Sequence, residues 1–89
     1  MSGDVTVRAI AVIARTQHLP PEAITIDKTF AELKFDSLDG MNILFAIETE
    51  FGIAIPDERV PQIKSVREMV EGIEEYLAAK EAAKQAPQQ

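Results

Sequence analysis

Apolar residues recur with the period of an α-helix in three stretches of this chain. The first stretch predicts a helix from Asp4, which we expect to be its N-cap, to about Gln17. Its apolar stripe consists of residues at helical spacing, with a last one that widens it: Val7, Ile10, Ala11, Ala14 and Ile13. Pro20 and Pro21 prevent the helix from continuing.

The second stretch predicts a helix that begins at Asp36 or Ser37 and ends near Phe51. Gly52 follows it and supplies a C-terminal stop. One apolar stripe of this helix is expected to face the core: Ile43, Leu44, Ile47 and Phe51. A second line lies among polar residues and is offset from the first: Leu38, Met41 and Phe45. A helix that is apolar on two sides is expected to have two partners.

The third stretch predicts the last helix, which begins with a capping box formed by Ser65 and Glu68. Its apolar stripe consists of six residues: Val66, Met69, Val70, Ile73, Tyr76 and Leu77. Before it, Pro56 opens a turn or a one-turn helix over residues 57–60, which Pro61 closes. The fold class is therefore all-α: a small four-helix bundle with three longer helices and one short one.

A long loop joins the first two helices, and apolar residues spaced along it should anchor it over the bundle: Leu19, Ile24, Ile26, Phe30 and Leu33. We expect residues 1–85 to form one domain and residues 86–89 to be a flexible tail. A domain of 89 residues has a small core and modest stability.

Composition excludes several classes of function. The chain has no cysteine and one histidine, which excludes disulfides, thiol nucleophiles and a thiolate or multi-histidine metal site, and we expect no metal. An isoelectric point near 4.6 argues against nucleic-acid binding. The N-terminus has no apolar run long enough for a signal peptide, and no stretch approaches a membrane span. We therefore expect a cytoplasmic protein, and we take a monomer as the working expectation, although the sequence does not determine the oligomeric state.

The acidity is local. Residues 36–59 contain six acidic residues and one arginine, a net charge of −5 out of −6 for the chain. Ser37 lies at the start of this segment, and a serine there is most often a helix cap. If Asp36 caps instead, the Ser37 hydroxyl is free at the positive end of the helix dipole, where a phosphate would be stabilised. Asp36 and Asp39 would repel that phosphate, so the local pattern leaves capping and attachment open.

The wider pattern resembles the acyl carrier proteins of dissociated fatty-acid and polyketide synthesis. The resemblance covers about residues 4–78 and rests on three segments: Asp36-Ser37-Leu38-Asp39, the helix that Glu50-Phe51-Gly52 closes, and Ile55-Pro56-Asp57-Glu58. It implies that Ser37 receives 4'-phosphopantetheine from coenzyme A through a separate phosphopantetheinyl transferase. It also implies a carrier rather than an enzyme, which presents acyl thioesters to enzymes that load, elongate and transfer them.

The resemblance suggests where partners with basic docking surfaces would bind. We expect the contact residues to be the second apolar line and the acids around it: Asp36, Leu38, Asp39, Met41, Phe45, Glu48, Asp57 and Glu58. Partial burial of the apolar line against the loop or the short helix is the alternative. In the family the acyl chain can be sheltered between helices, and four aliphatic residues are candidates to line that space or to be plain core: Ile43, Ile47, Ile73 and Leu77.

The chain departs from the family pattern at several positions. Lys34-Phe35 stands where many carriers have Gly and a small residue, Asn42 and Thr49 replace acids, and Gly40 interrupts the first turns of the helix. These departures favour a carrier for one dedicated pathway over the housekeeping carrier. Two other readings stay open: a peptidyl carrier of a nonribosomal pathway, and an unmodified acidic helical adaptor that uses the line from Leu38 to Phe45. A calcium-binding loop with Gly40 at its sixth position fails, because Phe35 and Ala46 would then occupy ligand positions.

Overall fold

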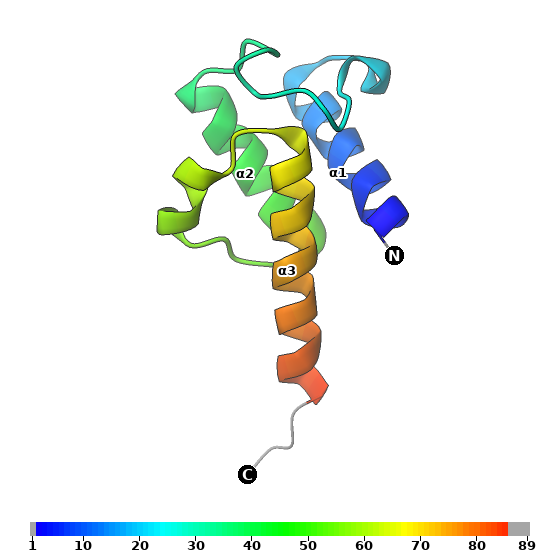
Figure 1. The fold of residues 1–89 in the computed structure, drawn as a ribbon, viewed down its shortest axis with the longest axis vertical. Coiled ribbons are helices and arrows are strands. Elements are labelled where there is room, and N and C mark those ends of the chain that lie inside the picture. Colours follow the sequence, from blue (N-terminus) through cyan, green and yellow to red (C-terminus); the bar gives the residue numbers. More distant parts are fainter. Residues whose placement is uncertain (1, 86–89) are drawn as a thin grey trace.

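The computed structural model describes residues 2–85, which contain helices and no strand. Figure 1 shows three long helices, with the long loop at one end and the C-terminal part of α3 projecting from the other. The elements in chain order are α1 (Ser2–Gln17), η1 (Pro21–Ala23), α2 (Ser37–Phe51), η2 (Asp57–Gln62) and α3 (Val66–Gln85). The all-α class and the bundle of three longer helices and a short one are confirmed. The 3-10 turn η1, inside the loop, was not expected. The predicted tail of residues 86–89 lies outside the described residues.

Helix α1 packs against both α2 and α3, with a face that agrees only in part with the predicted stripe: Ile13 and Ala14 are buried, and Ile10 packs against the core. It begins at Ser2, so Asp4 lies inside it and the prediction of Asp4 as N-cap is wrong. Val7 is 67% exposed and Ala11 is exposed, whereas the side that the structure buries consists of Val5, Ala9, Val12, Ile13 and Ala14. All residues of 9–14 are apolar, so periodicity alone could not fix which side faces the core.

Helix α2 has the predicted boundaries and the predicted buried stripe. Ile43, Leu44, Ile47 and Phe51 are all at most 5% exposed. At its C-terminus Gly52 adopts the left-handed conformation, with φ of 64°, and its N–H donates to the Glu48 carbonyl at 2.9 Å. The Lys80 ammonium of α3 donates to the Gly52 carbonyl at 2.8 Å. A cation at the C-terminal end of a helix is favourable for the helix dipole.

The loop between α1 and α2 is anchored as predicted at four of its five apolar positions. Ile24 is buried, and Ile26, Phe30 and Leu33 are half-buried against the core. The prediction for Leu19 is wrong, because this side chain is 37% exposed. The same loop also pairs with the start of α3 through its backbone. Phe30 N–H donates to the Lys64 carbonyl at 2.9 Å, and Val66 N–H donates to the Lys28 carbonyl at 3.0 Å.

The last part of the loop is a single helix-like turn that is capped at both ends. At its start, Thr29 and Glu32 exchange side-chain to backbone hydrogen bonds of 3.0 and 2.9 Å, the pattern of a capping box. At its end, Lys34 N–H donates to the Ala31 carbonyl and Phe35 N–H to the Phe30 carbonyl, both at 3.0 Å. These two bonds, with Lys34 at φ of 63°, form a Schellman motif.

The segment before α3 differs slightly from the prediction. Pro61 lies inside η2 instead of closing it. Ser65 accepts the Glu68 N–H at 3.1 Å as predicted, but the Glu68 carboxylate accepts the N–H of Lys64 at 2.8 Å, one residue before the expected position. The predicted stripe of α3 is confirmed. Its first four residues are buried, and Tyr76 and Leu77 are half-buried.

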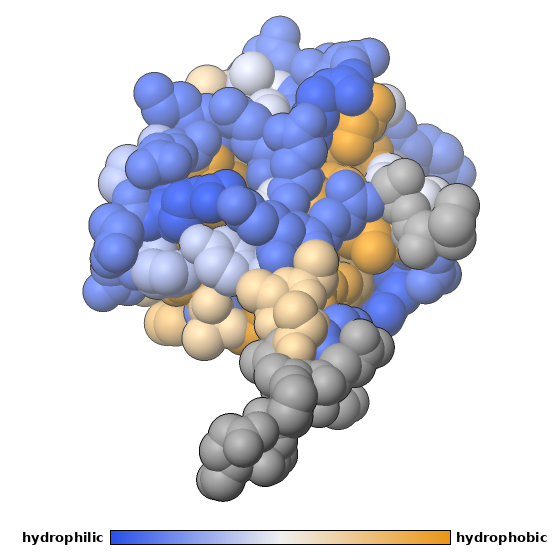
Figure 2. Space-filling view, turned by 60° about the horizontal axis from the view of Figure 1, so that its bottom comes forward, coloured by the Kyte–Doolittle hydropathy of each residue, from blue (hydrophilic) through white to orange (hydrophobic). Residues whose placement is uncertain are grey.

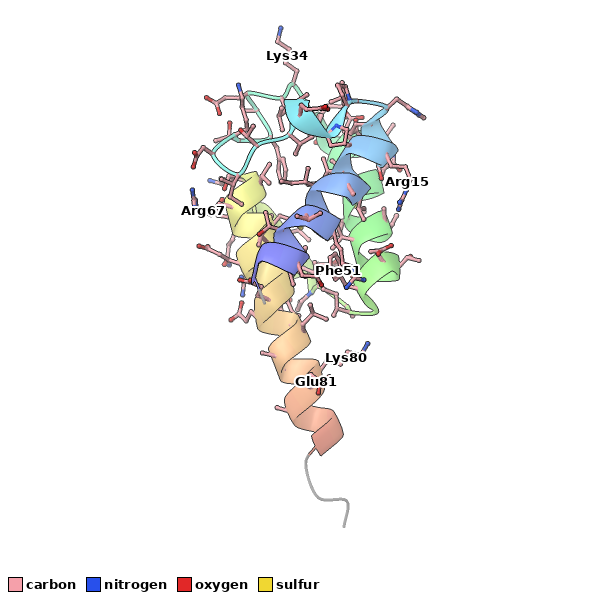
Figure 3. All side chains as sticks on the ribbon, turned by 90° about the vertical axis from the view of Figure 1, so that its right-hand side faces the viewer. Arg15, Lys34, Phe51, Arg67, Lys80 and Glu81 are labelled. Atoms are coloured by element: carbon pink, nitrogen blue, oxygen red, sulfur yellow. The ribbon has the colours of Figure 1, made fainter. Side chains whose placement is uncertain are left out.

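Charged residues connect the helices at the surface. Arg8 of α1 contacts the Glu50 carboxylate at 3.1 Å and lies 4.4 Å over the Phe51 ring. Arg59 of η2 contacts Glu75 of α3 at 2.7 Å, and this carboxylate raises the pKa of Arg59 above its ordinary value. In Figure 2 hydrophilic residues cover most of the face shown, and apolar atoms are visible in gaps between them. Figure 3 shows Lys34 at the loop end of the molecule, with Lys80 and Glu81 on the projecting part of α3.

Candidate functional site

Ser37 is the first residue of α2, and the capping of that helix leaves its hydroxyl free. The carboxylate of Asp36, the N-cap, accepts the Asp39 N–H at 2.8 Å, and the Asp39 carboxylate accepts the Asp36 N–H at 3.0 Å. This reciprocal capping box satisfies the first turn of the helix. Ser37 is exposed, and its hydroxyl has no hydrogen-bond partner among residues 2–85. Of the two roles that the sequence left open for Ser37, capping is excluded.

The electrostatics at Ser37 favour an anion less strongly than the helix end alone would. The N-terminus of α2 carries roughly half a positive charge from the helix dipole. Asp36 and Asp39 place two carboxylates beside it, but each uses one oxygen to accept a backbone N–H. A phosphate on Ser37 would therefore lie between a favourable dipole and two neighbouring anions. Chemically, the serine is an exposed hydroxyl without an imidazole beside it to accept its proton, since His18 lies at the other end of the loop, directly after α1.

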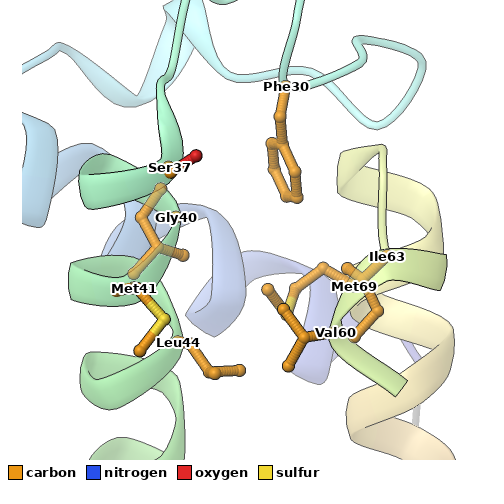
Figure 4. A pocket seen from close by; sticks show the side chains of 9 residues that line it. Phe30, Ser37, Gly40, Met41, Leu44, Val60, Ile63 and Met69 are labelled. Atoms are coloured by element: carbon orange, nitrogen blue, oxygen red, sulfur yellow. The ribbon is translucent and has the colours of Figure 1, made fainter. Parts of the chain in front are cut away.

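An apolar pocket of about 250 Å³ opens beside Ser37. It lies between α2, η2, the start of α3 and the capped turn of the loop. Its lining residues are Phe30, Ser37, Gly40, Met41, Ile43, Leu44, Val60, Ile63 and Met69. Figure 4 shows Ser37 at one end of this space, across from the Phe30 ring, with Leu44 and Met69 further in. Whatever is attached to the Ser37 oxygen therefore starts at the mouth of an apolar pocket.

The turn that carries Phe30 is held in place from two sides. Phe30 and Phe35 stack with ring centroids 6.0 Å apart, the apolar contact that commonly accompanies a Schellman motif. The backbone bond from Phe30 to Lys64 fixes the same residue to the segment before α3. The Phe30 ring is thus a positioned wall of the pocket, and Phe35 supports it from behind.

The sequence predicted this pocket only in part. Of the four aliphatic candidates to line a shelter, Ile43 lines the pocket, whereas Ile47 and Ile73 are fully buried core and Leu77 is half-buried elsewhere. For these three the alternative reading as core or plain packing is the right one. The part of the lining that comes from outside α2 was not predicted: Phe30, Val60, Ile63 and Met69. The spacing of Val60 and Ile63 along η2 and its flank was a signal for one apolar face there.

The second apolar line of α2 is exposed. Leu38 is 69%, Met41 43% and Phe45 56% exposed. The alternative of partial burial against the loop or η2 fits Met41, which lines the pocket together with Phe30 and Val60, but it does not fit Leu38 or Phe45. Large apolar side chains that are exposed next to one another on the same side of a helix are typical of an interaction surface.

The acids that were predicted to contact partners have different environments. Asp36 and Asp39 form the capping box. Glu48 is half-buried, and its carboxylate accepts the Ile55 N–H at 2.8 Å, which ties α2 to the segment before η2. Asp57 and Glu58 are exposed in the first turn of η2. The capping role of Asp36 agrees with the sequence, whereas the structural roles of the Asp39 and Glu48 side chains were not predicted.

Comparison with known proteins assigns the family. Residues 8–73 match the family model for the phosphopantetheine attachment site. The chain belongs to the acyl carrier protein family. The chain is 39% identical to the mitochondrial acyl carrier protein of Dictyostelium discoideum over 77 residues, which are 86% of this chain and 64% of that protein. The acyl carrier proteins of Rickettsia bellii and Thermosynechococcus vestitus are 43% and 37% identical over 70 residues each, 78% of this chain and 81% and 86% of theirs.

Membership of the acyl carrier protein family confirms three predictions. The family's cofactor is covalently attached 4'-phosphopantetheine, its members are carriers rather than enzymes, and they act with a phosphopantetheinyl transferase and acyl-processing enzymes. No helix within residues 2–85 is long and apolar enough to cross a membrane, and no cluster of three potential metal ligands lies in this part of the chain. The relatives include mitochondrial and bacterial proteins, so the cytoplasmic location stays a prediction.

Proposed function

We propose that Ser37 is the residue that carries 4'-phosphopantetheine. The observation that supports this most directly is the position of its free hydroxyl, at the N-terminus of α2 and at the mouth of the apolar pocket. Because Asp36 caps the helix, Ser37 can be esterified without loss of a structural hydrogen bond. The helix dipole stabilises the phosphate diester that results.

The attachment is a phosphoryl transfer from coenzyme A. The Ser37 oxygen forms the new bond to the phosphorus next to pantetheine, the pyrophosphate bond breaks, and adenosine 3',5'-bisphosphate leaves. The hydroxyl proton goes to a base of the transferase, because the one histidine of this chain lies at the other end of the loop and the neighbouring carboxylates of Asp36 and Asp39 accept backbone N–H groups. The thiol at the end of the arm then carries the acyl group as a thioester, which supplies the thiol chemistry that a chain without cysteine lacks.

The pocket beside Ser37 would shelter the acyl chain between encounters with enzymes. Its lining is almost entirely apolar, so each buried methylene contributes about 0.8 kcal/mol. A dry apolar cavity of about 150 Å³ binds benzene, which has six carbons. By the same measure the 250 Å³ here accommodate on the order of ten carbons, which favours acyl groups of medium length.

The exposed line of Leu38, Met41 and Phe45 is the docking face for partner enzymes in this proposal. Its acidic neighbours would steer basic enzyme surfaces toward it, and the apolar contact would hold the complex briefly. Asn42 and Thr49 are exposed and uncharged on the same helix. Their neutrality supports a carrier for one dedicated lipid or polyketide pathway, with residues 1–85 as the carrier domain.

Intact-mass measurement tests the assignment. The unmodified protein is incubated with coenzyme A, magnesium and a phosphopantetheinyl transferase, and the expected result is a mass increase of one phosphopantetheine group. Ser37→Ala should show no increase and should keep the helical circular dichroism of the wild type. Ser65→Ala, which removes another serine near a helix start, is the matched control and should be modified normally. Modification of Ser37→Ala would refute the assignment, and an unmodified wild type would favour the adaptor that uses the docking face alone.

A further inference from the structure

Gly40 is a glycine that the fold does not require. It lies in the first turns of α2 with an ordinary helical backbone, and its N–H donates to the Asp36 carbonyl at 2.9 Å. A Cβ built at this position would meet nothing within 4 Å. A glycine inside a helix is less favourable than alanine because its backbone loses more freedom on folding. Neither backbone conformation nor close packing therefore explains a glycine at this position.

The position of Gly40 relative to the pocket offers an explanation. Ser37, Gly40, Met41 and Leu44 are spaced i, i+3, i+4 and i+7, so they lie on one face of α2, and all four line the pocket. Gly40 is the residue between the attachment serine and the deeper Leu44, as Figure 4 shows. A side chain at this position would therefore add volume to the lining of the pocket between Ser37 and Leu44.

We propose that Gly40 is a specificity-determining residue, and that its missing side chain forms the passage through which a tethered acyl chain enters the pocket. This inference rests on the proposed attachment at Ser37. The passage is bounded by Gly40 and Met41 on α2 and by the fixed Phe30 ring on the other side. The width of this passage limits which acyl groups are sheltered. Gly40 controls that width from an exposed position of α2, where the fold tolerates a larger side chain.

The test compares Gly40→Leu and Gly40→Ala with the wild type. Asn42→Leu is the matched control, because it adds the same side chain to the same helix at an exposed residue that does not line the pocket. Each protein is converted to its phosphopantetheine form, the modified fraction is purified whatever its yield, and butyryl and octanoyl thioesters are prepared. The rate at which hydroxylamine cleaves each thioester reports how much of the time the acyl group is outside the pocket.

The equilibrium constant between the sheltered and the exposed acyl chain should grow about fourfold with each methylene that enters the pocket. We therefore expect the wild type and Asn42→Leu to protect the octanoyl group more than the butyryl group. Gly40→Leu should lose this difference and should be cleaved at least about tenfold faster as the octanoyl form, because several methylenes are kept outside. Gly40→Ala should fall between them and should melt at a higher temperature than the wild type, since alanine favours the helix.

Two results would overturn the inference, and they are distinguishable. Equal octanoyl protection in Gly40→Leu and the wild type, with both modified at Ser37, would show that Gly40 does not control entry while leaving the proposed function intact. A wild type that gains no mass, or gains it at another residue, would refute the proposed function and this inference with it. Circular dichroism of each variant shows that the measured rates belong to folded protein.

Discussion

Replacing Lys34 with Gly should make the protein more stable. Lys34 has φ of 63°, in the left-handed region that a side chain disfavours, and it ends the capped turn that carries Phe30. Its own side chain is exposed and points away from the bundle in Figure 3. The substitution therefore removes backbone strain without removing a packing contact.

The magnitude follows from two opposing effects. The left-handed conformation costs a residue with a Cβ about 1–2 kcal/mol relative to glycine. Glycine in turn has more freedom in the unfolded chain, which costs about 0.4–1 kcal/mol on folding. Subtracting the second range from the first leaves a net gain in the free energy of unfolding between about 0 and 1.6 kcal/mol, with a central value of about 0.8 kcal/mol. For a domain of this size the central value corresponds to a melting temperature higher by about 3–6 °C.

Thermal and urea unfolding, followed by circular dichroism, measure this effect. Lys34→Ala keeps the strain and removes the charge, so it separates the backbone contribution from that of the ammonium group. Lys28→Gly is the matched control in the same loop, because Lys28 is also exposed but does not have a positive φ. It should lower stability by about 0.4–1 kcal/mol. If Lys34→Gly destabilised the protein as much as Lys28→Gly does, the strain argument would be wrong.

Three further changes test other parts of the site. Asp36→Ala should lower the free energy of unfolding by about 1 kcal/mol and slow modification, because the capping box is lost and the first turn of α2 loosens; unchanged melting and rate would contradict this. Glu48→Ala should destabilise by about 1–2 kcal/mol, whereas Glu48→Gln, which can still accept the backbone N–H, should cost less, and equal losses would argue against that bond. With a general fatty-acid elongation system, replacing Asn42 and Thr49 with Glu should raise acyl loading rates at low salt and much less at high salt; equal low-salt rates would mean that these positions do not set specificity.

The parts of the fold that could be predicted from sequence are those with local physical signals. Helix α2 was predicted at both ends, because Asp36 is an N-cap residue and Gly52 occupies a position that needs a left-handed backbone. Its core stripe was predicted because polar residues interrupt the apolar ones and fix the phase. Helix α1 lacks such interruption over residues 9–14, and its buried side was predicted only in part, because Ile13 and Ala14 are buried but Val7 and Ala11 are exposed.

The residues that end α1 and the capped turn of the loop, His18 and Lys34, could not be recognised from the sequence. Both residues adopt a positive φ where helices usually have glycine, with φ of 63° and 58°. A lysine or a histidine gives no sequence signal for this conformation, so the capped turn at residues 29–35 was read as plain loop. The pocket was missed for a related reason. It is lined by residues from three separate segments, which only tertiary packing brings to α2.

The charge available for docking also differs between the sequence and the structure. The count along residues 36–59 gives six acids, but Glu50 pairs with Arg8 of α1, and Glu48 is half-buried and accepts a backbone N–H. Arg59, the one base in the segment, forms an ion pair with Glu75 of α3. Among the ion pairs of residues 2–85, none joins Arg59 to a carboxylate of α2. Of the remaining four acids, Asp36 and Asp39 accept backbone N–H groups in the capping box, and Asp39 is half-buried. Asp57 and Glu58 are exposed at the start of η2 and form no ion pair among residues 2–85. The charge that can attract a basic partner therefore lies at two places, the start of α2 and the start of η2, and it is smaller than the count along the sequence suggests.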